Sequence, residues 1–132
     1  MAVFPDRYES PQTVLTRTPD GKDMAILTGY AVFNEGFKGR STREWRRDEV
    51  FVVPPAPRAP AWATLDEVAA VVVPSAIYNR GRAVDAGWAI DSCRPALRED
   101  GLLSLICQIA VRDTDGYIFR LAYQATVIGR RR

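Results

Sequence analysis

The chain has 132 residues, of which 47% are hydrophobic and 26% are charged. These values are typical of a globular protein, and the length is enough for one domain with a buried core, spanning residues 1–132. The sequence contains no histidine and only two cysteines. It therefore excludes catalytic triads built on imidazole and the usual structural zinc sites. We expect neither a cofactor nor a metal, and we favour a binding or assembly role over an enzymatic one.

The beginning of the sequence lacks the basic segment and apolar run of a signal peptide. No apolar stretch approaches the ~18 residues that a membrane helix needs. We therefore expect a cytoplasmic chain with no membrane partner. In that reducing compartment both cysteines would be free thiols.

The formal net charge of +2 is unevenly distributed along the chain. Residues 38–47 contain five basic side chains and one acidic side chain, a net charge of +4, and residues 130–132 form a basic tail of three arginines. The rest of the chain is net acidic. This distribution predicts a basic segment on a mildly acidic body.

Four short turns that end in glycine divide the chain, at residues 19–21, 79–81, 99–101 and 114–116. Each turn lies between runs rich in β-branched and aromatic residues. A three-residue hairpin loop needs positive φ at its third position, which glycine adopts without steric cost. The pattern predicts four antiparallel hairpins, the first of which pairs residues 13–18 with residues 22–34.

The character of the sequence changes between residues 35 and 63. The run Ser41-Thr42-Arg43-Glu44 is a plausible helix start, so we expect a short basic helix through about Asp48. Residues 50–53 would form a short strand or an apolar anchor. Residues 54–60 contain four prolines, which predicts a stiff, extended segment. We interpret residues 35–63 as a basic, proline-rich insertion.

Two strands are expected after this insertion. Residues 68–78 read as a strand because Val71-Val72-Val73 is β-branched, although a capping box at residues 64–67 leaves a short helix at 65–71 as an alternative. In residues 82–97 the apolar positions change from even to odd numbers, which predicts a β-bulge near residues 91–93. The turn at 99–101 would then place Cys93 opposite Cys107.

The last turn predicts a hairpin between residues 103–111 and 119–127. Pairing Asp113 with Tyr117 would oppose apolar residues along one face, among them Ile109 with Leu121 and Cys107 with Tyr123. A slip of one residue would mix the two faces, so the turn and the hydrophobic pattern agree on one register.

Together these elements predict an all-β fold, an antiparallel meander of six or seven strands closed as a small barrel or a two-layer sandwich. The long insertion would carry one short helix. Residues 25–33 and 69–77 are apolar on both faces of their predicted strands. One of those faces would meet a second copy of the chain, so we expect a homo-oligomer.

Three sets of side chains are candidates for function. In the insertion, aromatic and basic residues alternate in a way that suits an anionic partner or single-stranded nucleic acid, unless the acidic neighbours neutralise the basic side chains. A small apolar ligand could meet tyrosine and tryptophan in the mouth of a barrel, where Asp91 is a weak candidate for a general acid or base. The cysteines are either a redox pair or two buried structural thiols. The partner-binding or anion-binding set is Phe37, Lys38, Arg40, Arg43, Trp45, Arg46 and Arg47, and the ligand-binding set is Tyr30, Trp88 and Tyr123.

Three functions follow from these features. We favour a non-catalytic interaction or assembly protein that self-associates through an apolar sheet face and presents residues 35–63 to a protein partner. The second is a small-molecule-binding barrel, in one version a histidine-free isomerase or cyclase. The third, nucleic-acid binding through the basic segment, is weakened by the small net charge, because affinity for phosphates needs a broad basic surface.

Overall fold

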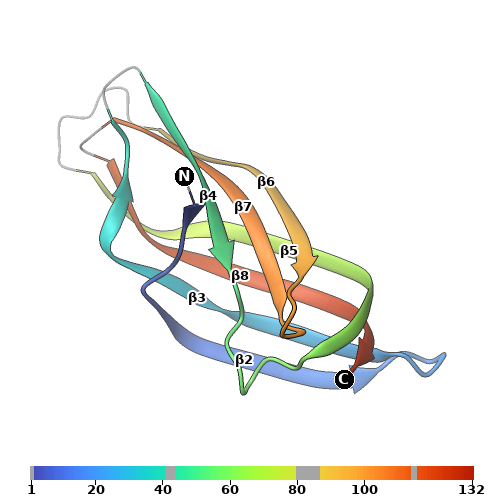
Figure 1. The fold of residues 1–132 in the computed structure, drawn as a ribbon. Coiled ribbons are helices and arrows are strands. Elements are labelled where there is room, and N and C mark those ends of the chain that lie inside the picture. Colours follow the sequence, from blue (N-terminus) through green and yellow to red (C-terminus); the bar gives the residue numbers. More distant parts are fainter. Residues whose placement is uncertain (1, 41–43, 80–86, 114–115) are drawn as a thin grey trace.

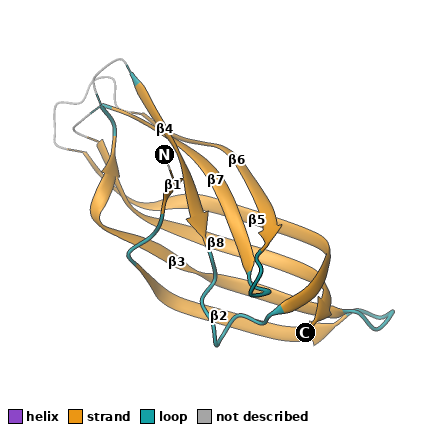
Figure 2. Ribbon diagram, in the orientation of Figure 1, coloured by secondary structure: helices purple, strands orange, loops and turns teal. Residues whose placement is uncertain are grey.

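The computed structural model describes residues 2–40, 44–79, 87–113 and 116–132. All regular structure within these ranges is β-strand, as Figure 2 shows. None of these residues forms a helix with the length and apolar character needed to span a bilayer. The strands are β1 (Ala2–Val3), β2 (Arg7–Arg17), β3 (Asp23–Lys38), β4 (Trp45–Val52), β5 (Trp62–Asn79), β6 (Gly87–Leu97), β7 (Leu103–Arg112) and β8 (Gly116–Arg131).

The strands form two four-stranded sheets that lie over one another (Figure 1). One sheet has the strand order β1-β4-β7-β6 and the other has the order β2-β3-β8-β5. The predicted all-β class is confirmed, and of the two predicted architectures the structure has the two-layer one without a closed barrel. Alternate residues of each long strand point into the space between the sheets, as the period of two in a strand requires. The fully buried side chains there include Leu27, Val50, Trp62, Leu105, Ile109, Leu121 and Val127.

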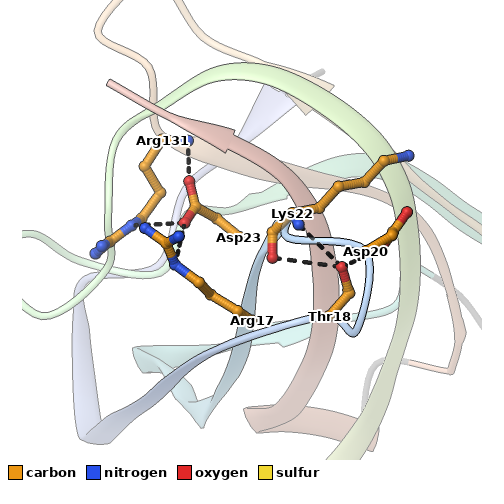
Figure 3. Close-up of polar contacts among 6 residues, drawn as sticks. All are labelled: Arg17, Thr18, Asp20, Lys22, Asp23 and Arg131. Atoms are coloured by element: carbon orange, nitrogen blue, oxygen red, sulfur yellow. Dashed lines mark hydrogen bonds and ion pairs between the residues drawn. The ribbon is translucent and has the colours of Figure 1, made fainter.

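The first hairpin, between β2 and β3, is confirmed. Gly21 adopts a φ of 87°, and the backbone N–H of Thr18 donates to the carbonyl of Lys22 at 2.9 Å. The Thr18 hydroxyl donates to the carboxylate of Asp20 and accepts the backbone N–H of Lys22 (Figure 3). Beside this turn, Asp23 accepts the backbone N–H of Arg131 at 3.0 Å, which ties β3 to the end of β8.

The hairpin between β6 and β7 is also confirmed, together with its bulge. Gly101 has a φ of 83°, and Arg98 and Leu102 are joined by a backbone hydrogen bond across the turn. The register of β6 on β7 shifts between Ile90 and Ser92. This one-residue shift turns Cys93 towards the core, directly opposite Cys107.

The predicted hairpin between residues 103–111 and 119–127 is wrong. The strands β7 and β8 lie in different sheets, where β7 pairs with β4 and β6, and β8 pairs with β3 and β5. The residues expected to oppose one another, such as Ile109 and Leu121, are buried in the same core from opposite layers. The hydrophobic pattern identified the inner faces but could not distinguish a strand beside β7 from a strand across the core.

Because the chain changes sheet after β1, β3, β4, β5 and β7, the fold is also not a meander. The strands β5 and β6 likewise belong to different sheets, and the turn predicted at residues 79–81 falls largely outside the described residues. Within the described ranges the sandwich has eight strands, where the sequence predicted six or seven.

The short basic helix expected from Ser41 to Asp48 is not seen. Residues 41–43 lie outside the described part, and residues 45–52 form β4, paired antiparallel with β7. Asp48 and Arg46 point inward beside Val50 and Val52, so two charged residues occupy positions where apolar ones would reveal a strand. The alternative helix at residues 65–71 is not formed either, because that segment belongs to β5.

Gly129 marks the closest approach of β8 to β5. A Cβ atom at this position would overlap the backbone carbonyl oxygen of Thr64, next to the register shifts of β5 on β8. We expect Gly129→Ala to lower the free energy of unfolding by about 2 kcal/mol, because backbone atoms cannot move aside as a flexible side chain would. Urea denaturation followed by circular dichroism measures this loss. Ser92→Ala, at an exposed position on β6, is the control and should change stability by less than ~0.5 kcal/mol.

Candidate interaction surface

The outer surfaces of the two sheets differ in charge. The outer surface of β4, β7 and β6 carries acidic and basic side chains that pair with one another, and we call it the charged face. Arg47 donates to Asp91 at 3.2 Å, and Arg94 donates to Glu49 at 3.5 Å. Beside these ion pairs lies an aromatic stack, in which Phe4, 61% exposed, lies on Phe51 at 5.1 Å between ring centroids.

The outer surface of the other sheet is almost free of charge, and we call it the open face. It consists of four rows of side chains that run across β2, β3, β8 and β5. Among these described positions only Glu9 and Glu67, at diagonally opposite corners, are charged. The rows are Thr16-Met24-Ile128-Glu67, Val14-Ile26-Thr126-Ala69, Gln12-Thr28-Gln124-Val71 and Glu9-Tyr30-Ala122-Val73.

Aliphatic side chains on this face are exposed to solvent. Val14 and Val71 are each 59% exposed and Val73 is 46% exposed, all three on the outer strands of the sheet. Around them lie amide and hydroxyl groups, which both donate and accept hydrogen bonds. Branched aliphatic residues suit strands, but on a solvated face threonine or charged residues serve as well. The open face therefore exposes aliphatic side chains among uncharged polar groups.

A shallow hollow of about 460 Å³ lies in the middle of the open face. Its floor passes over Gly29, which has no side chain, and its walls include Gln12, Tyr30, Val71 and Val73. On the core side, a Cβ atom at Gly29 would come within 2.5 Å of the Tyr123 hydroxyl oxygen. Glycine at this position therefore lets Tyr123 pack against the sheet from inside.

Charged groups collect at the two ends of the open face. At one end Arg120 lies over the Tyr30 ring, 4.6 Å from its centroid, and it also approaches Glu9 at 3.6 Å and donates to the Ser75 hydroxyl. At the other end Lys22 pairs with Asp66 at 3.4 Å. The face thus has an uncharged centre and a polar rim, the arrangement found in protein interfaces.

The edges of the sheets do not favour the addition of a strand from another chain. Three edge strands contain a proline, which has no backbone N–H to donate: Pro11 in β2, Pro74 in β5 and Pro95 in β6. The remaining edge, β1, has two residues. The register of β2 also shifts between Glu9 and Gln12. Association through a face is therefore easier than association through an edge.

The residues of the predicted ligand set do not meet in an interior cavity. Tyr30 faces outward on β3, whereas Tyr123 is buried on β8 with its ring edge against Tyr8, at 6.2 Å between centroids. Both residues border the hollow of the open face, and Trp88 does not. Trp88, at the beginning of β6, packs against Gly116. Burial raises the pKa of the Tyr123 hydroxyl to about 12, so it is protonated at neutral pH.

Most of the predicted anion-binding set is engaged within the chain. Arg46 donates to Asp48 at 2.6 Å and stacks on the buried Phe37 ring, 4.6 Å from its centroid. Trp45 lies near two guanidinium groups, those of Arg112 and Arg47. Further members of this set lie elsewhere: Lys38 is near the Tyr117 ring, Arg40 is exposed, and Arg43 falls outside the described residues.

Asp91 is the residue of the β6 bulge. Its carboxylate is 43% exposed and pairs with Arg47 on the charged face, and it does not point into the core. The set that the sequence reasoning missed is the polar part of the open face, namely Gln12, Thr28, Gln124 and Thr126. The signal was present in the two-sided apolar character of residues 25–33 and 69–77, but it does not say which of the two faces is covered.

In comparisons of the chain with family models, with curated proteins and with solved structures, nothing matches.

Two ion pairs of β4 provide a test of the structure at this end of the sandwich. Asp48 pairs with Arg46 inside the sandwich, where the Asp48 side chain is 1% exposed, whereas Asp91 pairs with Arg47 at the surface. We expect Asp48→Ala to cost about 3 kcal/mol of stability, because it leaves a largely buried guanidinium without its carboxylate. Asp91→Ala should cost less than ~1 kcal/mol. Equal losses in urea denaturation would contradict the inward orientation of Asp48.

Proposed function

We propose that this chain is a non-catalytic assembly protein that associates with a second copy of itself through the open face. The observation that carries the proposal is the contrast between the two outer surfaces. One surface has paired charges, and the other exposes Val14, Val71 and Val73 around uncharged polar groups. Exposed apolar surface that is contiguous and bordered by polar residues is typical of protein interfaces.

A second copy of the chain fits the open face better than a charged partner does. The centre of the face offers no charge with which an acidic or basic partner would pair. Its glutamines and threonines can instead bond with the same groups of a facing copy, since amides and hydroxyls are both donors and acceptors. A two-fold axis that passes between the two open faces, one from each copy, brings the same patch of both copies together. Two-fold symmetry is the commonest symmetry of homo-oligomers. The prolines of the edge strands disfavour pairing through the edges.

The size of the face indicates how tight the association is. Four strands spaced at ~4.8 Å and seven residues rising by ~3.3 Å each give an area of roughly 300 to 400 Å². Stable interfaces bury about 800 Å² on each partner. The open face must therefore recruit its rim, or the association is weak. We expect a dimer that dissociates on dilution, in the micromolar range of concentration.

In such a dimer the charged face points away from the contact. This places β4, which belongs to the 35–63 region, on the outside of the assembly with Trp45 and Arg47 accessible. We propose that a protein partner meets this region while the open face holds two copies together. Nucleic-acid binding is less favoured, because Arg46 and Arg47 already pair with carboxylates of the chain.

The test is light scattering coupled to size-exclusion chromatography over a ~100-fold range of concentration. The wild-type chain should change from monomer to dimer, and high salt should not dissociate the dimer, because its contact is uncharged at the centre. Gln124→Arg places a charge in the middle of the open face and should shift the transition to at least ~10-fold higher concentration.

Gln108→Arg is the matched control. Gln108 is an exposed glutamine on the central strand β7, in the middle of the charged face and opposite Glu49. This substitution adds the same charge to the same type of position, and the transition should stay at the wild-type concentration. A wild-type chain that is monomeric throughout the range would refute the proposal. So would a dimer that Gln108→Arg dissociates and Gln124→Arg does not.

A further inference from the structure

The two cysteines lie side by side on neighbouring strands of the sheet β1-β4-β7-β6, which carries the charged face. Cys93 on β6 is directly opposite Cys107 on β7, and their Sγ atoms are 3.5 Å apart. The Cα atoms of directly opposed residues in an antiparallel pair are about 4.5–5.5 Å apart, within the range that disulfides span. A disulfide bond needs an Sγ–Sγ distance of about 2.05 Å, so the two sulfur atoms must approach by about 1.5 Å.

The two thiols differ in exposure. Cys93 is half-buried on the edge strand β6, whereas Cys107 is completely buried in the core. The Cys107 thiol donates its hydrogen bond to the sulfur of Cys93. That hydrogen bond stabilises the Cys93 thiolate and lowers the pKa of Cys93 to about 7. The same hydrogen bond, in which Cys107 is the donor, and burial raise the pKa of Cys107. Cys93 is therefore placed to attack an oxidant first, and Cys107 is placed next to it to attack second.

We propose that Cys93 and Cys107 form a redox-active dithiol, which a small-molecule disulfide such as glutathione disulfide converts into a cross-strand disulfide bond. Cys93 is the residue that the oxidant modifies first, and Cys107 resolves the adduct. The site lies on β6 and β7, so it does not depend on association through the open face.

The reaction takes place in two exchange steps. The Cys93 thiolate attacks one sulfur of glutathione disulfide, a bond forms between Cys93 and that glutathione, and the other glutathione leaves as a thiolate that takes up a proton. Cys107 then attacks Sγ of Cys93, the bond between Cys93 and glutathione breaks, and the proton of Cys107 passes to the departing second glutathione. The protein loses two electrons and two protons, and glutathione disulfide gains them to become two glutathione molecules.

The product joins an edge strand to a central strand. In sheet β1-β4-β7-β6, β6 pairs with β7 alone, so its attachment depends on that one ladder. A Cys93–Cys107 bond would hold this ladder together when its hydrogen bonds open. Oxidation is therefore expected to raise the urea concentration at which the protein unfolds, because the bond constrains the unfolded chain.

Mass spectrometry of the intact protein after incubation with glutathione disulfide tests the proposal. The reduced wild-type chain should lose the mass of two hydrogen atoms, retain no glutathione and lose both titratable thiols. Cys107→Ala should stop at the first step and keep one glutathione on Cys93. Cys93→Ser should remain unmodified while folded, because Cys107 is buried. Circular dichroism establishes that each variant is folded.

Two results would overturn the proposal. The first is a wild-type chain that keeps one glutathione on Cys93, because Cys107 would then be unable to reach the adduct. The second is a folded wild-type chain in which both thiols stay free under conditions that oxidise the same chain in urea. Both results come from the wild-type protein, so the test does not depend on the folding of a variant.

Discussion

The packing of two sheets across a single apolar layer is the constraint on which the rest of this structure depends. The strands β3, β4, β5, β7 and β8 contribute buried aliphatic and aromatic side chains to that layer, and the edge strands β2 and β6 add partly buried residues such as Tyr8 and Ile90. The layer also accommodates the ion pair between Arg46 and Asp48, near the beginning of β4. Once the inner faces are used in this way, each sheet has one outer face left. The chemistry of the protein is decided by what those two outer faces carry.

The two outer faces expose side chains of different chemistry to solvent. The charged face carries ion pairs beside apolar side chains, among them Phe51, on which the exposed Phe4 ring stacks. Along β3 and β5 the outward side chains of the open face are largely apolar, as the inward side chains of the same strands are. Exposure of its valines to water is unfavourable in free energy. The edges, in contrast, are protected by Pro11, Pro74 and Pro95 against the addition of strands. A chain that protects its edges and leaves one face uncharged is suited to association through that face.

Local features of this fold could be predicted from the sequence. The turns at Gly21 and Gly101 need positive φ, the change of parity near Asp91 predicted the bulge, and the pairing across the Gly101 turn predicted that Cys93 lies opposite Cys107. Each of these predictions depends on a few neighbouring residues. The apolar character of the open face could also be predicted from local sequence, because residues 25–33 and 69–77 are apolar on both faces of their strands.

Long-range pairing could not be predicted in the same way. A row of inward apolar residues, such as that of Ile109, packs equally well beside a strand of its own sheet or beneath a strand of the other sheet. The turn after β7 therefore suggested a hairpin where the chain crosses between layers. The strand β4 was hidden for another reason, since Arg46 and Asp48 occupy inward positions and remove the alternation that identifies a strand. The capping signal at residues 41–44 then favoured a helix.

The most direct test of the central claim, that the open face is the contact between two copies, is hydroxyl-radical footprinting at concentrations below and above the association transition. Met24 and Tyr30 lie on the open face, and Phe4 and Trp45 lie on the other side of the molecule. We predict that Met24 and Tyr30 are oxidised more slowly in the concentrated sample, while Phe4 and Trp45 react at an unchanged rate. Protection of Phe4 and Trp45, with Met24 and Tyr30 as reactive as in the dilute sample, would contradict the account.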